Sequence, residues 1–368
     1  MMSIPIQSVA AHLEALAPLT YQESYDNAGL LVGDPGAPVR GILVTLDCTE
    51  AVVEEAVRRG SNLIVAHHPI VFKGLKKLNG RTYVERTVLR AIRADVAIYA
   101  AHTNLDHVTP GVNHHLAGTL GLADVRILSP KKGLLQKLTT FVPTEATQPV
   151  LDALYAAGAG QVGAYRNCSF RAEGTGTFQP TEGTHPAIGQ VGTDEEVRED
   201  RIEVLLPAHR AGAVLRALRA AHPYEEVAYY LSALENEYQD VGAGAIGELP
   251  EPLDEGAFLA HLRDRLGLKV VRHTPLRERP VRRVAVCGGA GSFLLAEARR
   301  QGADAFVTAD FKYHEFFDAE GELVICDVGH YESEVGTKEL LRKYLSEKFP
   351  TFATLLSETD TNPVQYFF

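Results

Sequence analysis

Short, uninterrupted apolar runs alternate with amphipathic stretches at both ends of the chain. Residues 42–46 and 62–66 have the length and composition of buried strands. Between them, residues 50–59 show the 3.6-residue periodicity of a helix, which Gly60 ends. Apolar strands of this length that alternate with helices are typical of a parallel sheet covered on both faces. The pattern therefore predicts an α/β fold.

The same β-α-β pattern occurs twice. Residues 55–65 align with residues 297–307, which follow another predicted strand at 284–287. A further strand follows in each half, at 96–101 and at 323–328. The sequence therefore predicts a core of two pseudo-repeated β-α-β halves.

Between these halves the order of elements changes. The predicted order is β-α-β-β-α-β, with strands at 138–142, 201–206 and 226–234, a strand and loop at 165–178, and helices at 148–157 and 208–221. That order is typical of a ferredoxin-like α+β domain. We therefore expect a first core half at 1–132, an inserted ferredoxin-like domain at 133–240 and a second core half at 241–368.

Charge and cysteine content narrow the class of protein. The 368 residues carry a net charge of −11 and no basic run, which argues against a nucleic-acid polymer as the main partner. The four cysteines lie far apart, which suits a reducing compartment. The N-terminus lacks the pattern of a signal peptide, and no apolar stretch reaches membrane-spanning length. We expect a cytoplasmic protein without a membrane partner.

Imidazole and carboxylate side chains follow three of the predicted strands. The ends of parallel strands lie at one edge of a sheet, where ligands collect. A single His-His pair before a proline is commonly a polar turn, but three clusters at analogous positions favour a site for two metal ions. The clusters are His67 with His68, His102 with Asp106, and His330 with Glu334.

The individual residues carry different weight. His330 and Glu334 open a predicted helix that continues to about residue 347, and their spacing of four places both on one face. Asp106 precedes a turn, and a plain turn aspartate is the alternative. His102 is either a ligand or a partner that orients one. Asp310, which the repeat places opposite the histidine pair, is a candidate pocket residue.

Imidazole and carboxylate ligands suit Zn, Fe, Mn, Co or Ni, and make Mg less favoured. Two such divalent ions bridged by a carboxylate would generate hydroxide near neutral pH, which is hydrolytic chemistry. A structural zinc site is not expected, because cysteine is absent from the clusters.

Two further motifs have weaker signals. Gly288, Gly289, Gly291 and Ser292 lie between a predicted strand and helix and could admit a phosphate, although a tight β-α turn explains them as well. The polar segment 222–226 of the insert is interpreted as a loop or interface element.

Taken together, these motifs resemble the NIF-three-like proteins, often called GTP cyclohydrolase 1 type 2 homologues. The resemblance covers nearly the whole chain. It rests on the segments 67–72, 102–106, 287–292, 329–334 and 361–363.

The resemblance implies a dinuclear site that uses His67, His68, Asp106, His330 and Glu334, with Glu334 as the bridge. It also implies a toroidal homohexamer, and the insert resembles the trimeric CutA-like and nitrogen-regulatory domains of some bacterial members. We therefore expect a metal-dependent hydrolase of a nucleotide or related small molecule. The named reaction would open the imidazole ring of GTP and release formate. Phosphoester hydrolysis at the same site and a non-catalytic metal-binding scaffold or regulator are the alternatives.

Overall fold

The computed structural model describes residues 4–367 and divides into two compact units. The first unit joins Met1–Ser129 to Asp240–Phe368, and the second is Pro130–Gln239. Within the described residues, no helix combines the length and the apolarity that a membrane crossing requires.

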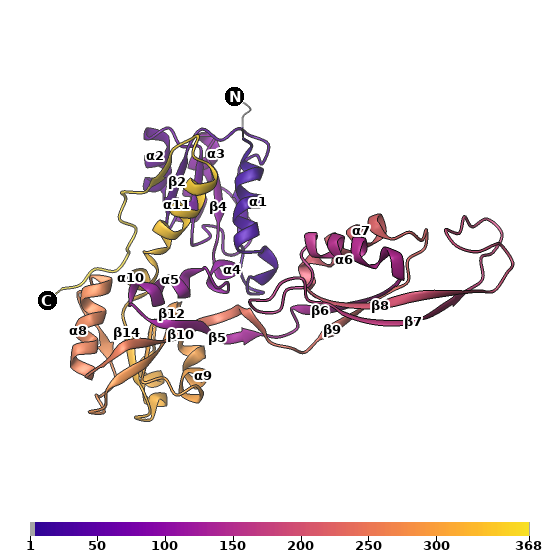
Figure 1. The fold of residues 1–368 in the computed structure, drawn as a ribbon. Coiled ribbons are helices and arrows are strands. Elements are labelled where there is room, and N and C mark those ends of the chain that lie inside the picture. Colours follow the sequence, from indigo (N-terminus) through magenta and orange to yellow (C-terminus); the bar gives the residue numbers. More distant parts are fainter. Residues whose placement is uncertain (1–3, 368) are drawn as a thin grey trace. The chain divides into compact units, whose positions relative to one another are not determined.

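The first unit contains a five-stranded sheet from the two ends of the chain (Figure 1). Its strand order is β1 (Gly29–Val32), β4 (Ala97–Ala100), β3 (Leu63–Ala66), β2 (Ile42–Thr45) and β15 (Thr354–Leu356). The last four run parallel, whereas β1 is an antiparallel edge strand. Strands β2, β3 and β4 are buried along their whole length, as their runs of Val, Ile and Leu predict.

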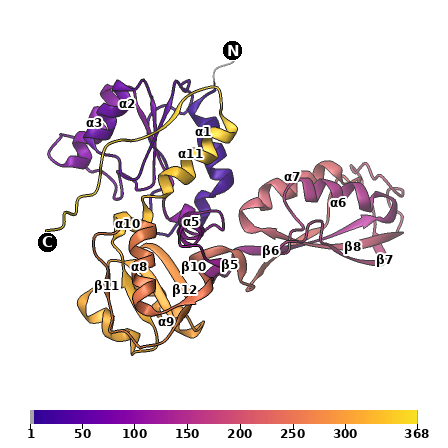
Figure 2. The same ribbon diagram turned by 60° about the vertical axis from the view of Figure 1, so that its left-hand side comes forward.

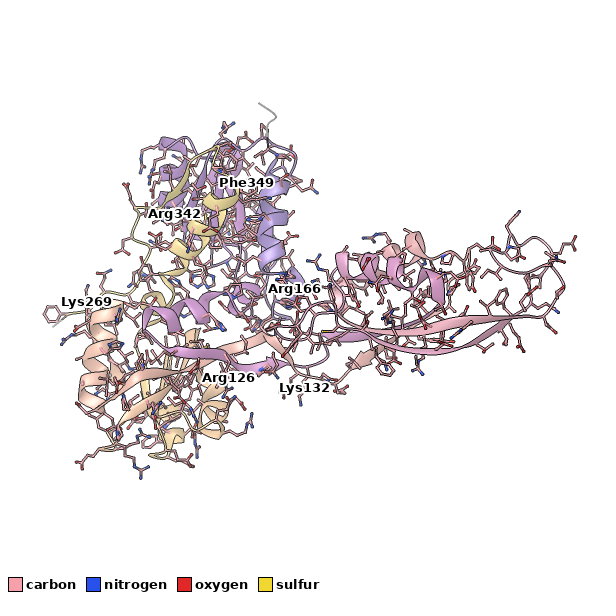
Figure 3. All side chains as sticks on the ribbon, in the orientation of Figure 1. Arg126, Lys132, Arg166, Lys269, Arg342 and Phe349 are labelled. Atoms are coloured by element: carbon pink, nitrogen blue, oxygen red, sulfur yellow. The ribbon has the colours of Figure 1, made fainter. Side chains whose placement is uncertain are left out.

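Helices cover both faces of this sheet. Helices α2 (Glu50–Arg58) and α3 (Tyr83–Arg93) pack with Leu43, Ile64 and Ile98 in one apolar cluster. On the other face, α11 (Thr337–Lys348) packs on β2 and β15. Helix α1 (Ile6–Leu16) joins α11 there, because the His12 and Tyr344 rings stack at 4.2 Å (Figure 2). Phe349, labelled in Figure 3, meets the His12 ring edge-on at 5.4 Å.

A second sheet of the same unit has six strands. Their order is β11 (Arg272–His273), β14 (Val324–Asp327), β13 (Ala305–Ala309), β12 (Val281–Ala290), β10 (Tyr238–Leu253) and β5 (Ala123–Lys131). Strands β12, β13 and β14 are parallel, while β10 pairs antiparallel with β12 and β11 with β14. Helices α5 (Val112–Thr119) and α8 (Glu255–Leu266) bury one face, and α9 (Leu295–Arg300) buries the other. The first sheet therefore contains four parallel strands and the second contains three, and the periodicity did not predict the antiparallel strands beside them.

The helix expected over 330–347 is two helices. Helix α10 (His330–Glu334) ends before Gly336, and α11 begins at Thr337. A Cβ at Gly336 would approach His115 Nε2 within 2.7 Å, so the small residue allows the chain to turn close to α5. The expectation of one helix was wrong because the i, i+4 pattern continues across the break.

The second unit is an antiparallel sheet with two helices. Its strand order is β7 (Phe170–Phe178), β8 (Glu195–Pro207), β6 (Leu135–Pro143) and β9 (Tyr229–Leu234). Helix α6 (Thr147–Ala156) follows β6, and α7 (Ala211–Ala221) follows β8. Leu138, Ile202, Val204, Val214 and Leu218 are among the side chains that form its own apolar core.

Candidate metal centre

The polar side chains of the candidate metal site lie at the carboxyl ends of parallel strands, in both sheets of the first unit. His67 and His68 follow β3, and His102 follows β4. His330 follows β14 and begins α10, after Gly329 turns the chain with a φ of 93°. Helix α10 then places Glu334 one turn further on, where it is 4% exposed.

Glu334 is surrounded by imidazole nitrogens. Its Oε2 atom lies 3.0 Å from His68 Nε2 and 3.1 Å from His330 Nε2. Its Oε1 atom lies 3.6 Å from His67 Nε2. One carboxylate oxygen therefore faces the His68–His330 side and the other faces His67.

Each of four histidines is held at its Nδ1 atom by an oxygen acceptor. His67 Nδ1 is 2.7 Å from the Ala101 carbonyl, and His68 Nδ1 is 2.7 Å from Asp47 Oδ1. His102 Nδ1 meets Asp26 Oδ1 and His330 Nδ1 meets Asp310 Oδ2, both at 2.7 Å. When Nδ1–H donates to these oxygens, Nε2 presents its lone pair. Such a carboxylate or carbonyl behind each imidazole is the usual arrangement of metal-binding histidine.

The residues present fit a divalent metal ion. His67 Nε2 and Asp106 Oδ1 are buried, have no hydrogen-bond partner and lie 3.7 Å apart. Buried polar atoms are rarely left unsatisfied, so this pair fits the ligand atoms of a bound cation. Ligand atoms also fall into two groups within 4.8 Å, His67–His68–His102 and His68–His330–Glu334. A nitrogen and oxygen donor set of this kind suits Zn, Fe, Mn, Co or Ni.

The electrostatics of the cluster follow from burial and close contact. Burial disfavours the charged form of His68, but hydrogen bonds to Asp47 and Glu334 outweigh it and raise the His68 pKa to about 10. Burial also opposes charge on His330, yet Glu334 raises the His330 pKa to about 9. Burial lowers the pKa of His67. When no metal ion is bound, the His68 and His330 rings are therefore protonated at neutral pH.

The two carboxylic acids respond in opposite directions. Burial, together with the charge of Glu334, raises the pKa of Asp106. Burial acts to raise the pKa of Glu334 as well, but the imidazoles of His67 and His330 outweigh it and lower that pKa. The nearby Cys287 thiol stays neutral, because burial raises its pKa.

The structure brings the predicted ligand residues together, from both halves of the chain. His67, His68, Asp106, His330 and Glu334 lie in one cluster, and His102 joins it through ring contacts of 5.4–5.5 Å with His67 and His68. Asp310, predicted as a pocket residue, contacts His330 through its carboxylate.

In the glycine loop at 288–292, two backbone amides that could bind a phosphate donate to side chains of the protein instead. The Gly288 amide donates to Asn113 Oδ1 and the Gly289 amide to Ser333 Oγ, each at 2.9 Å. A Cβ at Gly289, whose φ is 63°, would lie 2.5 Å from Glu334 Oε1. These glycines therefore let the backbone pass close to the cluster, and phosphate binding by Gly288, Gly289, Gly291 and Ser292 stays a prediction.

Sequence reasoning missed Asp47 and Asp26. Asp47 follows β2 at the same sheet edge as the histidines, so its position after an apolar run was an available signal. Asp26 lies in a loop before β1 and also accepts a hydrogen bond from the Thr103 amide at 3.0 Å. Burial opposes its charge, but hydrogen bonds from His102 and Thr103 lower the Asp26 pKa to about 2. No periodicity marks a residue in such a loop.

Two cavities adjoin the cluster. One of about 480 Å³ is lined by Asp106, His330 and Glu334, together with Tyr25 and Phe293. The other, of about 410 Å³, is lined by His68 and His330 and by Arg272. Each is large enough for a small molecule.

Comparisons with known proteins identify the family. Residues 4–363 match the model of the Duf34/NIF3 (NGG1p interacting factor 3) family. The chain is 40% identical over 365 residues to a "GTP cyclohydrolase 1 type 2 homolog" of Halalkalibacterium halodurans, covering 98% of each chain. A protein of the same name from Bacillus subtilis is 37% identical, with 99% of each chain covered.

Solved structures agree with this match. A Bacillus cereus protein described as related to NIF3 is 37% identical, covers 100% of both chains and superposes with a TM-score of 0.88. A Staphylococcus aureus protein is 30% identical with a TM-score of 0.79, again over 100% of both chains. The chain therefore belongs to the Duf34/NIF3 family.

Proposed function

We propose that the protein is a hydrolase that depends on two divalent metal ions and acts on a nucleotide or a related small molecule. The observation that carries this proposal is the cluster of four histidines held at Nδ1, three of which face the buried Glu334. Preorganised Nε2 atoms next to a carboxylate are suited to binding metal rather than to packing. The family resemblance implies the same site.

The contacts support one ion on each side of Glu334. His67, Asp106 and Glu334 Oε1 would hold the first, with His102 as a further ligand. His68, His330 and Glu334 Oε2 would hold the second. Glu334 would bridge the two. Bound divalent ions supply a water of lowered pKa and a Lewis acid.

The residues of the chain would bind and orient the substrate. In the GTP reaction, water adds at C8 and opens the imidazole ring, and hydrolysis of the resulting formamide releases formate. The cavity beside Asp106 contains no Lys or Arg among its lining residues. In that cavity the charge of a triphosphate would have to be balanced by the metal ions, whereas Arg272 lines the other cavity beside the cluster.

The direct test is formate release from GTP by the metal-loaded protein. We expect turnover by the wild type, its loss in His68→Ala and Glu334→Gln, and its retention in the exposed control variants His314→Ala and Glu339→Gln. Equal turnover in all five proteins would contradict the proposal. A parallel screen of phosphoesters separates the two hydrolytic reactions.

A non-catalytic metal-binding scaffold or regulator is the second candidate. The observation that favours it is the separate second unit, which has a core of its own and none of the histidines and carboxylates of the metal cluster. A metal-loaded protein that turns over neither nucleotides nor phosphoesters would support this function.

A separate proposal concerns the domain organisation of the chain. We propose two pseudo-repeated core halves, 1–132 and 241–368, with an inserted ferredoxin-like, CutA-like domain at 133–240. The β-α-β-β-α-β order of the second unit supports the insert. We further propose the toroidal homohexamer and the cytoplasmic location, which light scattering and cell fractionation would test.

A further inference from the structure

The second unit has an open cavity of its own. It has a volume of about 450 Å³. Its wall comes from β6, β7 and β8, from residues 180–188 between β7 and β8, and from residues 224–230 after α7. None of these residues belongs to the metal cluster, so its chemistry is independent of the proposed hydrolase.

Four aromatic rings line this cavity in two pairs. The Phe141 and Tyr230 rings are perpendicular with centroids 6.0 Å apart. The Phe178 and Tyr224 rings form a second edge-to-face pair at 5.8 Å. Aromatic faces carry partial negative charge and attract a cation that lies against them.

The charged groups of the wall have one sign. Glu199, Glu225 and Glu226 line the cavity, and none of its lining residues is Lys or Arg. Glu199 is only 7% exposed, and the Tyr224 hydroxyl donates to its Oε1 at 2.9 Å. Among residues 4–367, no Lys or Arg forms an ion pair with Glu199. A buried carboxylate normally has a cationic partner, which this one lacks.

His222 does not supply that missing charge. Its Nε2 atom donates to the Phe141 carbonyl at 2.9 Å, and its Nδ1 atom accepts from the Tyr224 amide at 3.1 Å. A ring that donates at one nitrogen and accepts at the other is neutral. Burial also lowers the pKa of His222, which favours the same neutral form of the ring.

Gly176 leaves the space that the carboxylate occupies. Strand β7 pairs with β8, and a Cβ on Gly176 would overlap Glu199 Oε2. Any larger residue there would push the carboxylate out of its place. Because Gly176 has no side chain, the Glu199 carboxylate can stay at the wall of the cavity.

We propose that this cavity binds a small organic cation with a primary ammonium group. The ammonium would donate to Glu199 and lie against the Tyr224 and Phe178 rings, while its carbon chain contacts the apolar wall. A quaternary ammonium could use the rings but could not donate to the carboxylate, so the primary amine is the chemistry that uses both features.

Isothermal titration of the full-length protein with putrescine and spermidine tests the proposal, with the uncharged 1,4-butanediol as a matched ligand. We expect at least one amine to bind below about 10 mM and the diol not to bind. Glu199→Gln should weaken the amine at least about tenfold, because a charge-assisted hydrogen bond is lost. Glu196→Gln, an exposed change in the same strand outside the cavity, should leave the affinity unchanged.

Thermal unfolding and metal content of both variants check that they fold. Should Glu199→Gln fail to fold, Phe141→Leu removes part of the aromatic wall and should weaken binding several-fold. Absence of amine binding to the wild type would overturn the proposal, as would equal affinity in the Glu199 and Glu196 variants. Equally tight binding of the diol, or displacement of the amine by Zn²⁺ at this site, would also overturn it.

Discussion

Asp47 is expected to control metal affinity without touching a metal ion. Its Oδ1 atom holds His68 Nδ1 at 2.7 Å, and its Oδ2 atom accepts from the Thr361 hydroxyl at 2.8 Å. The carboxylate therefore fixes both the tautomer and the orientation of the imidazole. Asp47→Ala removes this support and leaves every proposed ligand in place.

The size of the effect follows from the contact that is lost. A hydrogen bond to a charged group contributes about 1.5–3 kcal/mol, which corresponds to roughly 10–100-fold in affinity. Asp47→Asn keeps an acceptor near His68 and loses only the charge, so its loss should be about tenfold or less. Thr361→Val removes one hydrogen bond to Asp47 and acts on His68 only through that carboxylate, so a change of about fivefold or less is expected.

Competition with a chromogenic chelator at fixed pH measures these affinities for Zn²⁺. Asp264→Ala, an exposed aspartate on α8, is the control and should bind like the wild type. Equal affinity in Asp47→Ala and Asp264→Ala would refute the idea that Asp47 supports a metal ligand.

Three further predictions concern the cluster and the core. Gly289→Ala should remove bound metal, because its Cβ would lie 2.5 Å from a carboxylate oxygen of the cluster; metal analysis checks this. Ile64→Ala, at a fully buried position, should lower the free energy of unfolding by about 2–5 kcal/mol in denaturant titration, and no loss would contradict the packing. Burial acts to raise the Glu55 pKa, but hydrogen bonds, with that of Ser357 the largest, lower it to about 2. Its stabilisation is therefore full above its ordinary pKa of 4.5 and is lost as pH falls toward 2; Glu55→Gln should cost about 2 kcal/mol at pH 7, with a smaller difference from wild type at pH 2–3.

The central parallel strands were predictable because burial on both faces leaves a plain sequence signal. Strands β2 and β3 lie where the apolar runs at 42–46 and 62–66 indicate. The antiparallel strands β1 and β10 were not predictable, because β1 has only four residues, β10 mixes apolar and polar residues, and both owe their pairing to tertiary contacts.

The candidate site likewise has some residues that the sequence predicts and others that it does not. His67, His68 and His330 stand directly after apolar runs, so their side chains could be placed at a sheet edge from the sequence. Their meeting with Glu334 depends on how the two sheets pack, which local patterns do not encode. The loop residue Asp26 shows this most clearly, since only the folded chain brings it to His102.

Metal content of the protein purified without a histidine tag tests the central claim most directly. Elemental analysis should find about two divalent ions per chain in the wild type and in Glu339→Gln. Glu334→Gln should hold fewer, because Glu334 places one oxygen on each side of the cluster. A metal-free wild type that takes up no Zn, Fe, Mn, Co or Ni would contradict the account, as would wild-type metal content in Glu334→Gln.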